Sequence, residues 1–187
     1  IATDMACSEN YTSEQISTRQ VEIEKVAGHY GFTSVSQLPF SPAKLDETPK
    51  RLLICEVIDV LEKIRPVEIY IPYRNDAHND HEAVFDAVIA AAKSFRRPYI
   101  ARIYAYEVIS ETDFGFKPED GGFRPNVFVD ISKFLQKKLS ILELFESEVA
   151  EFPFPRSRLA VESLARLRGS QCNSLAAESF MLIKEIK

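Results

Sequence analysis

The side chains best suited to chemistry gather in one short stretch of the chain, residues 73–81. The stretch holds His78 and His81, two of the three histidines in the sequence, together with Asp76 and Asp80. Residues three positions apart at the start of a helix can face the same side. One imidazole could therefore bind a divalent metal ion through a ring nitrogen, while the other serves as a proton donor or electrophile. Either aspartate could fix the tautomer of a neighbouring imidazole and raise its basicity.

The position of this stretch favours a site over the alternative, a polar loop in which Asp80 only caps a helix. Residues 67–71 are short and rich in β-branched side chains, which predicts a buried strand closed by Pro72. A helix is expected to begin near Asp80 or His81. In doubly wound α/β sheets, ligands bind beyond the carboxyl ends of the strands, at the loop that enters the next helix. Residues 72–81 therefore lie where a binding site is expected.

The elements that must position this stretch alternate between helix and strand, which indicates an α/β domain with a doubly wound sheet. Thr12 and Gln15 form a capping box that opens the first helix, and Gly31 is a good C-terminal stop. Thr48 as N-cap and Pro49 as the first helical residue predict the start of a second helix. Strands are further expected at residues 99–108 and 127–129, helices at 81–91, 132–148 (capped by Ser132) and 157–167, and a short helix or strand at the C-terminus.

Residues 110–125 are predicted to form a long loop, because they carry Gly115, Pro118, Gly121, Gly122 and Pro125. Loops of that length inside a compact domain are usually functional or mobile. The same segment holds three phenylalanines, Phe114, Phe116 and Phe123. They could line a substrate entrance or pack the loop down.

Composition places the chain among globular proteins, with 187 residues and 45% hydrophobic side chains, enough for one domain. The net charge of -5, with acids and bases interspersed, argues against a nucleic-acid surface. The longest apolar run is too short to span a membrane. Cys7, Cys55 and Cys172 lie far apart and form no Cys-x-x-Cys pair. They are interpreted as reduced thiols, so we expect a cytoplasmic protein.

The segment Asp76-Ala-His-Asn-Asp-His81 resembles the Asp-x-His-x-Asp-His signature of the PIG-L/LmbE-like N-acetyl-sugar deacetylases. Other landmarks of that family follow in the family's order along nearly the whole chain. They are Arg19 and Glu22, Leu45-Asp46, Tyr106-Glu107, Pro125-Asn126 with Asp130-Ile131, Arg168-Gly169, and Ala177-Glu178-Ser-Phe180.

The resemblance implies a Rossmann-like three-layer α/β domain with a mostly parallel sheet and one zinc ion (Zn2+). Such an enzyme hydrolyses the acetamide of N-acetylated amino sugars or sugar conjugates, including those of N-acetylglucosamine. His81 would be a zinc ligand. His78 would stabilise the tetrahedral oxyanion or protonate the leaving amine, and Asp80 would orient and tune His78. Family relatives commonly self-associate, so a homo-oligomer is also expected.

Further candidates for contacts with sugar hydroxyls or a phosphate lie around this stretch and farther along the chain. They are Arg74, Asp76, Glu107, Asn126 and Arg168. Arg168 could equally be an ordinary cation at a helix end near Gly169. For Glu107 the plain alternative is a solvated carboxylate.

The sequence departs from the family at its first signature, His-Pro-Asp-Asp-Glu, which is absent. In the family that segment supplies the other two zinc ligands and the general base. Because Ile1-Ala-Thr-Asp4 resembles the end of the family's second strand, we expect residues 1–187 to be a single, N-terminally incomplete domain lacking one strand-helix unit, roughly 30 residues. The alternative is a catalytically silent relative that acts as a sugar-binding or assembly module. A nucleotide-binding Rossmann protein is disfavoured because no Gly-x-Gly-x-x-Gly occurs.

Overall fold

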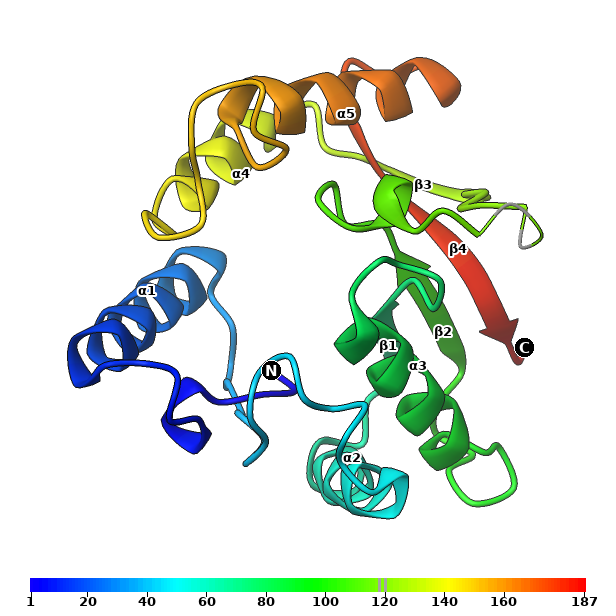
Figure 1. Ribbon diagram of the computed structural model, residues 1–187. Coiled ribbons are helices and arrows are strands. Elements are labelled where there is room, and N and C mark those ends of the chain that lie inside the picture. The colour runs from blue at the N-terminus through cyan, green and yellow to red at the C-terminus, as the bar shows by residue number, and fades with distance from the viewer. Residues whose placement is uncertain (118, 120) are drawn as a thin grey trace.

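The computed structural model describes residues 1–117, 119 and 121–187; Pro118 and Asp120, which belong to the predicted long loop, lie outside the described residues. Helices and strands alternate along much of the chain, as Figure 1 shows. In chain order the elements are η1 (Met5–Cys7), α1 (Ser13–Tyr30), α2 (Lys50–Ile64), β1 (Glu68–Pro72), α3 (Asn79–Ala91), β2 (Arg102–Tyr106), η2 (Thr112–Phe114), β3 (Val127–Asp130), α4 (Leu135–Leu142), α5 (Arg158–Gln171) and β4 (Ala177–Glu185).

The four strands form one sheet in the order β1-β2-β4-β3. β1 pairs with β2 in parallel, with Ile69 opposite Ile103, whereas β4 runs antiparallel to both β2 and β3. Helices lie on both sides of the sheet, so the α/β prediction is confirmed. The prediction of a mostly parallel sheet is wrong for the described residues, since one of their three strand pairings is parallel.

The reversed strand follows from the chain path between β3 and β4. A parallel neighbour is usually reached through a single crossover helix. Here two helices, α4 and α5, separate the strands. After them the chain is back at the end of the sheet where β3 finished, because Ala177 lies opposite Asp130 and the amide of Ile131 donates a hydrogen bond to the carbonyl of Ala176. From that point β4 can only run back, antiparallel to β3.

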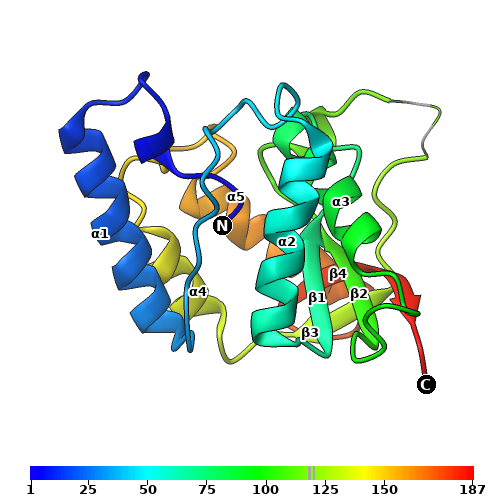
Figure 2. The ribbon, with the colours of Figure 1, turned by 90° about the horizontal axis from the view of Figure 1, so that it is seen from below.

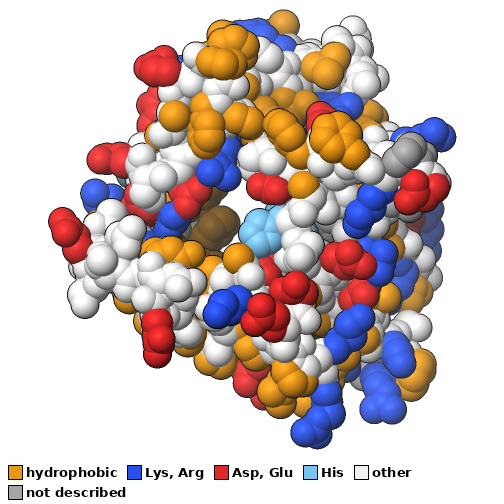
Figure 3. Space-filling model, in the orientation of Figure 1, with side chains coloured by type: hydrophobic (Ala, Val, Ile, Leu, Met, Phe, Trp, Pro, Cys, Tyr) orange, Lys and Arg blue, Asp and Glu red, His pale blue; other side chains and the backbone are white. Residues whose placement is uncertain are grey.

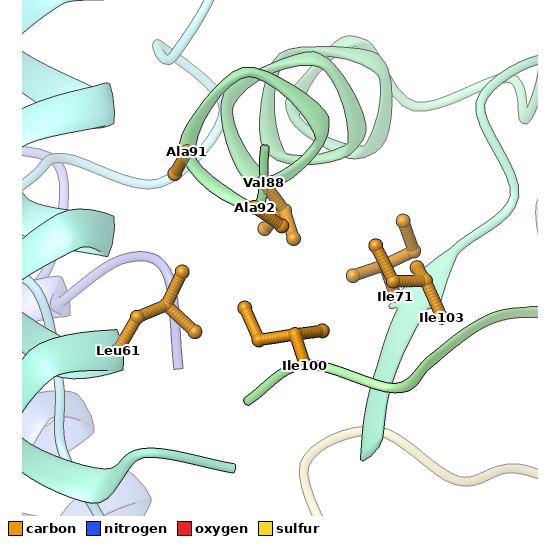
Figure 4. Packing of buried hydrophobic residues seen from close by; sticks show 7 residues of the cluster. All are labelled: Leu61, Ile71, Val88, Ala91, Ala92, Ile100 and Ile103. Carbon is orange, nitrogen blue, oxygen red and sulfur yellow. The ribbon is translucent and has the colours of Figure 1, made fainter. Parts of the chain in front are cut away.

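The main core lies between the sheet and the helices α2 and α3. Apolar side chains from both helices meet those of β1 and β2, and Figure 4 shows them pointing toward one another. The buried members of this cluster are Leu61, Ile71, Val88, Ala91, Ala92, Ile100 and Ile103. Each large aliphatic side chain buried here contributes about 1.5–3 kcal/mol, so the packing fixes β1 against α3. The turn that joins these two elements carries the histidines.

A second core packs α4 against α5 and the start of β4. Its buried residues are Leu135, Leu139, Val161, Ala165 and Ala176. Gly169 of α5 allows the chain to turn back closely, because a Cβ at this position would lie 2.7 Å from the carbonyl oxygen of Ser174. None of the described helices is long and apolar enough to cross a membrane.

The helix ends confirm some local predictions and correct others. Thr12 and Gln15 form the capping box of α1, and Gly31 ends this helix with a φ of 75°. The N-cap of α2 is Pro49 rather than Thr48, whose hydroxyl donates to the carbonyl of Lys44 instead.

The predicted cap at Ser132 is wrong, because α4 begins only at Leu135 and Ser132 binds the carboxylate of Asp130. α4 also ends at Leu142, earlier than the predicted residue 148. Past its end, residues 145–148 contact α1 instead of extending the helix: Phe145 lies against Arg19, and Ser147 binds Glu22.

The first four residues lie beside residues 36–40 and outside the four-stranded sheet. The amine of Ile1 donates to the carbonyl of Ser36, the amide of Leu38 donates to Ile1, and the amide of Asp4 donates to Phe40. The first two bonds have the pattern of a parallel bridge between Ile1 and residue 37. The N-terminus lies between α1 and α2 in both Figure 1 and Figure 2.

Candidate active site

A cavity of about 830 Å³ opens between α1, α2 and the carboxyl end of β1. Its walls are mostly apolar: Ile23 and Val26 come from α1, and Val57 and Leu61 from α2. The polar side chains at one end include His78, Asp80 and His81. Figure 3 shows pale-blue histidine atoms at a hollow whose rim carries orange, apolar side chains together with red and blue charged ones. The predicted site at the loop between β1 and α3 therefore opens into a cavity.

His81 is held by a buried carboxylate. Its Nδ1 lies 2.7 Å from Oδ2 of Asp76, whose side chain is 0% exposed. An ionised carboxylate can only accept, so the proton of the neutral imidazole sits on Nδ1 and the lone pair on Nε2. Burial and then the charge of Asp76 raise the pKa of the Tyr106 phenol. The arrangement is the carboxylate–histidine pair that commonly orients a metal-binding imidazole.

His78 has the opposite tautomer. Its Nδ1 accepts a hydrogen bond from the backbone amide of Asp80 at 3.1 Å, which caps the first turn of α3. The proton of the neutral ring therefore sits on Nε2, as a donor. The two rings stack, with centroids 5.2 Å apart and planes 12° from parallel. One stacked imidazole thus offers a lone pair and the other an N–H group.

The expected contact between the Asp80 carboxylate and His78 does not form. Both oxygens of Asp80 accept backbone amides of another segment, from Ala43 at 2.8 Å and Leu45 at 2.9 Å. Asp80 is 8% exposed, and these two bonds satisfy its buried charge. Asp80 therefore reaches His78 through its own backbone amide, while its carboxylate anchors residues 43–45 to α3.

Asp76 was expected to contact substrate; in the structure its carboxylate is buried against His81, and a substrate contact stays a prediction. The residue is 3% exposed, and its oxygens accept hydrogen bonds from the His81 ring and from the hydroxyl of Thr112. Of the two aspartates that could hold an imidazole, Asp76 is the one whose carboxylate does so. Its physical place is behind His81, away from the cavity lining.

Arg74 lies on the outer side of the same turn and binds carboxylates of α3. Its Nε donates to Asp86 and its Nη2 to Glu82, both at 2.8 Å. Hydrogen bonds from Arg74 and Lys50 hold the pKa of Asp86 below its ordinary range. Asn126 has a backbone partner, because its Oδ1 accepts the amide of Leu182 at 2.8 Å. A substrate contact at Arg74 or Asn126 stays a prediction.

Glu107 and Arg168, predicted separately as substrate contacts, bind each other. The guanidinium donates to both carboxylate oxygens, at 2.8 and 2.5 Å, and Ser179 donates to Oε1 at 2.7 Å. The Arg168 and Glu107 side chains are 15% and 12% exposed. Neither alternative from the sequence, a plain helix-end cation or a solvated carboxylate, describes this nearly buried bidentate pair. A substrate role for the two residues stays a prediction.

Replacing Arg168 with alanine is expected to lower the free energy of unfolding by about 3 kcal/mol, because the Glu107 carboxylate would keep its burial and lose its partner. Urea denaturation measures the change. Arg166→Ala is the matched control, since Arg166 pairs with Glu162 on the surface of the same helix and should cost no more than about 0.5 kcal/mol. Equal losses in the two variants would contradict the importance of the buried pair.

The segment 108–115 contributes a residue that the sequence did not single out. Thr112 donates from its hydroxyl to Oδ1 of Asp76 at 2.7 Å, and the carbonyl of Glu111 accepts the amide of Ala77 at 3.1 Å. Gly115 packs so closely on the same turn that a Cβ there would lie 2.2 Å from the carbonyl oxygen of Asn75. The length of the predicted loop was the only sequence signal for this contact.

Gly115→Ala is expected to destabilise the protein by about 1–3 kcal/mol, because the added methyl group would push against the backbone of residue 75. Thermal unfolding measures the effect. Gly28→Ala is the matched control: it faces open space in α1 and should instead stabilise by about 0.5–1 kcal/mol. Stability of Gly115→Ala at or above that of the unmodified protein would show that the loop does not press on this turn.

Of the three loop phenylalanines, Phe123 packs the loop down, and Phe114 and Phe116 are exposed. The ring of Phe123 packs edge-on against Tyr73 at 5.5 Å, and the guanidinium of Arg168 lies 5.9 Å from its centre. Phe123 therefore packs the loop onto the carboxyl end of β1. Phe114 and Phe116 are 48% and 87% exposed, and neither lines the cavity.

Arg19 and Glu22 tie α1 to the turn after α4. Both oxygens of Glu22 accept the hydroxyl of Ser147 at 3.1 Å, and Arg19 pairs with Glu148. The same turn places Phe145 in the cavity lining. This pair of family landmarks therefore closes one side of the cavity.

The donors near His81 do not complete a metal site by themselves. Among the described residues, no three His, Cys, Asp or Glu side chains come together in a way that could hold a metal ion. A zinc site ordinarily needs at least three protein ligands. The side chains present would supply His81 Nε2 as one ligand, with Asp76 orienting it.

Residues 2–92 match the family model described as PIG-L: GlcNAc-PI de-N-acetylase. The fold is similar to a conserved protein from Thermus thermophilus, with 20% identity, a TM-score of 0.74, and coverage of 100% of this chain and 80% of that chain. An N,N'-diacetylchitobiose deacetylase from Pyrococcus horikoshii is 18% identical with a TM-score of 0.69, over 95% of this chain and 67% of that chain.

A third similar structure is a 4-carboxy-2-hydroxymuconate hydratase from Pseudomonas putida, at 18% identity and a TM-score of 0.67, over 98% of this chain and 78% of that chain. At such identities these likenesses show the fold alone. Because the fold carries both a deacetylase and a hydratase, the reaction has to be argued from the site residues.

Proposed function

We propose, from the match of residues 2–92 to the PIG-L family model, that the protein is a zinc-dependent deacetylase that removes the acetyl group from an N-acetylated amino sugar or sugar conjugate. The family match supports hydrolysis of an acetamide. The similarity of the fold to a chitobiose deacetylase agrees with a sugar substrate.

The observation that carries the proposal is the pair of stacked imidazoles at one end of the cavity. His81 offers a lone pair at Nε2, because Asp76 holds its Nδ1, and His78 offers an N–H group at Nε2, because Asp80 donates to its Nδ1. An acetamide in hydrolysis gains negative charge on its oxygen and needs a donor there. A site that presents one donor and one acceptor nitrogen side by side fits that need.

In this proposal His78 Nε2–H donates a hydrogen bond to the oxyanion of the tetrahedral intermediate, and the ring keeps its proton because Nδ1 accepts the Asp80 amide. A positioned donor of this kind acts without reorganisation, because the backbone amide of Asp80 already fixes the ring. Asp80 contributes further by anchoring residues 43–45 to the start of α3. The stacked geometry keeps the N–H group of His78 next to His81.

His81 is the one described residue that we propose as a zinc ligand. The described residues bring no third ligand to the ion, and no step of the reaction is derived through the metal. His81 is suited to be one ligand because its second nitrogen is fixed by a buried carboxylate, the arrangement that fixes the tautomer of metal-binding histidines. The remaining ligands would come from outside the described residues.

In the proposal the sugar binds in the cavity next to His78 and His81. Arg74, Glu107, Asn126 and Arg168 stay candidate contacts of the sugar. A cytoplasmic location also stays a prediction, with Cys7, Cys55 and Cys172 as free thiols, and so does self-association.

The proposal is tested by incubating the protein with N-acetylglucosamine, its glycosides and N,N'-diacetylchitobiose in the presence of zinc, and measuring acetate and free amine. Because the family's first signature is absent from the 187 residues, the assay is run on this chain and on the chain extended upstream of Ile1 as encoded. Equal amounts of acetate and amine are expected. Sugar binding by both forms without release of either product would favour the silent binding module instead.

A further inference from the structure

We propose that Thr112 is a positioning residue that sets the tautomer of the His81 imidazole through Asp76. Its effect on catalysis rests on the function proposed above, whereas its effect on the ring does not.

The direction of the hydrogen bonds around Thr112 follows from its neighbours. The backbone amide of Val108 donates to the Thr112 hydroxyl oxygen at 2.7 Å. A hydroxyl carries one proton, which is then directed to its second neighbour, Oδ1 of Asp76, at 2.7 Å. Oδ2 of Asp76 in turn accepts from Nδ1 of His81 at 2.7 Å. Hydrogen bonds from the Thr112 hydroxyl and from the His81 ring therefore converge on the Asp76 carboxylate, which leaves the lone pair of His81 on Nε2.

Thr112 acts on a carboxylate that few other groups reach. The Asp76 side chain is 0% exposed, so water does not supply an alternative donor. Its oxygens lie within hydrogen-bond distance of the His81 ring and the Thr112 hydroxyl. The negative charge of Asp76 also acts on the Tyr106 phenol and contributes to raising the pKa of that group. Without the hydroxyl, Oδ1 would lose a hydrogen bond and the carboxylate would be free to rotate away from the ring.

The segment that carries Thr112 is fixed to the histidine turn at two further points. The carbonyl of Glu111 accepts the amide of Ala77, and Gly115 lies against the carbonyl of Asn75. These contacts join a segment after β2 to the turn after β1, about 36 residues earlier in the chain. The position of the hydroxyl is therefore set by the loop backbone and not by the side chain alone.

The test records the ring nitrogens of His81 by long-range proton–nitrogen NMR, at pH 8, above the ordinary imidazole pKa of about 6.5. The unmodified protein is expected to show His81 with its proton on Nδ1. Thr112→Val should show a mixture of the two tautomers and faster exchange of that proton. Thr112→Ser keeps the hydroxyl and should restore the single tautomer. Asp76→Asn, which leaves the Thr112–Val108 bond in place, should also show the mixture.

Thr18→Val is the matched control, because Thr18 is exposed in α1, far from the site in sequence, and its replacement should leave the His81 signals unchanged. In an active protein, Thr112→Val should lower kcat about 10-fold with KM unchanged, and Thr112→Ser should recover it. A single unmodified His81 tautomer in folded Thr112→Val, or in Asp76→Asn if the first variant does not fold, would overturn the proposal. Changed tautomers in a protein that releases no acetate would leave it standing and count against the proposed function alone.

Discussion

His81→Ala is expected to weaken zinc binding by more than about 100-fold and to abolish acetate release. Loss of a residue that only supports a ligand costs 10–100-fold, and loss of the ligand itself should cost more. Zinc content after dialysis, measured by mass spectrometry against protein concentration, gives the result directly. His29→Ala is the control, because His29 lies exposed in the last turn of α1 and should not affect zinc.

Two outcomes separate the roles that His81 could have. Zinc retained at the unmodified level by His81→Ala would contradict its role as a ligand. Loss of zinc together with collapse of the fold would instead point to a structural defect, so unfolding curves are recorded on the same samples. His81 is 23% exposed in its side chain, and its removal should cost little stability compared with a core residue.

Replacement of His78 is expected to lower kcat and to leave zinc binding unchanged. Removing the N–H donor should lower kcat by about 10²–10³-fold, the range found when one oxyanion donor is lost in another hydrolase, while zinc content stays unchanged. The better variant is His78→Asn, since His78 also caps α3 through the amide of Asp80. Asparagine is a favoured N-cap residue, so it keeps the helix start and removes the ring donor.

His78→Ala serves as the comparison, because it removes both functions of the ring. It should lose about 1 kcal/mol of stability that His78→Asn retains, and both should lose the same catalytic factor. Unchanged kcat in His78→Asn would remove His78 from the reaction. Activity lost only in His78→Ala would show that capping, and not the hydrogen bond from Nε2–H, is its contribution.

The sequence predicted where the turn with the two histidines lies, because the signals for that turn are local. A short β-branched strand, a proline and a polar turn before a helix define the carboxyl end of β1 within about 15 residues, and the structure places the turn there. The capping box at Thr12 and the left-handed Gly31 were predictable for the same reason, since their partners lie within one helical turn.

The contacts that give the site residues their roles were less predictable. Thr112 meets Asp76 from 36 residues away, and Arg168 meets Glu107 from 61 residues away. Such pairs depend on which strands become neighbours, and the antiparallel insertion of β4 was itself not predicted. Local patterns do not set the order or direction of strands, because the connections between them do.

The two aspartates of the signature show that even within a single turn the sequence does not determine which groups their carboxylates bind. Both Asp76 and Asp80 could have held an imidazole, and the resemblance assigned Asp80 to His78. The backbone geometry gives a different arrangement. At the N-terminal turn of α3, the Asp80 carboxylate accepts hydrogen bonds from the amides of residues 43 and 45. Asp76 lies before the helix, and its carboxylate contacts His81. The spacing of the signature therefore predicted that an aspartate would hold an imidazole, but not which aspartate or which imidazole.

The most direct measurement is the isotope content of acetate released from N-acetylglucosamine or its glycosides in ¹⁸O-labelled water. Hydrolysis of an acetamide at the two stacked imidazoles predicts one ¹⁸O atom per acetate, with the rate abolished in the double variant His78→Asn/His81→Ala. No labelled acetate from the unmodified, zinc-supplied protein, or the same rate in the double variant, would contradict the assignment of this site to deacetylation.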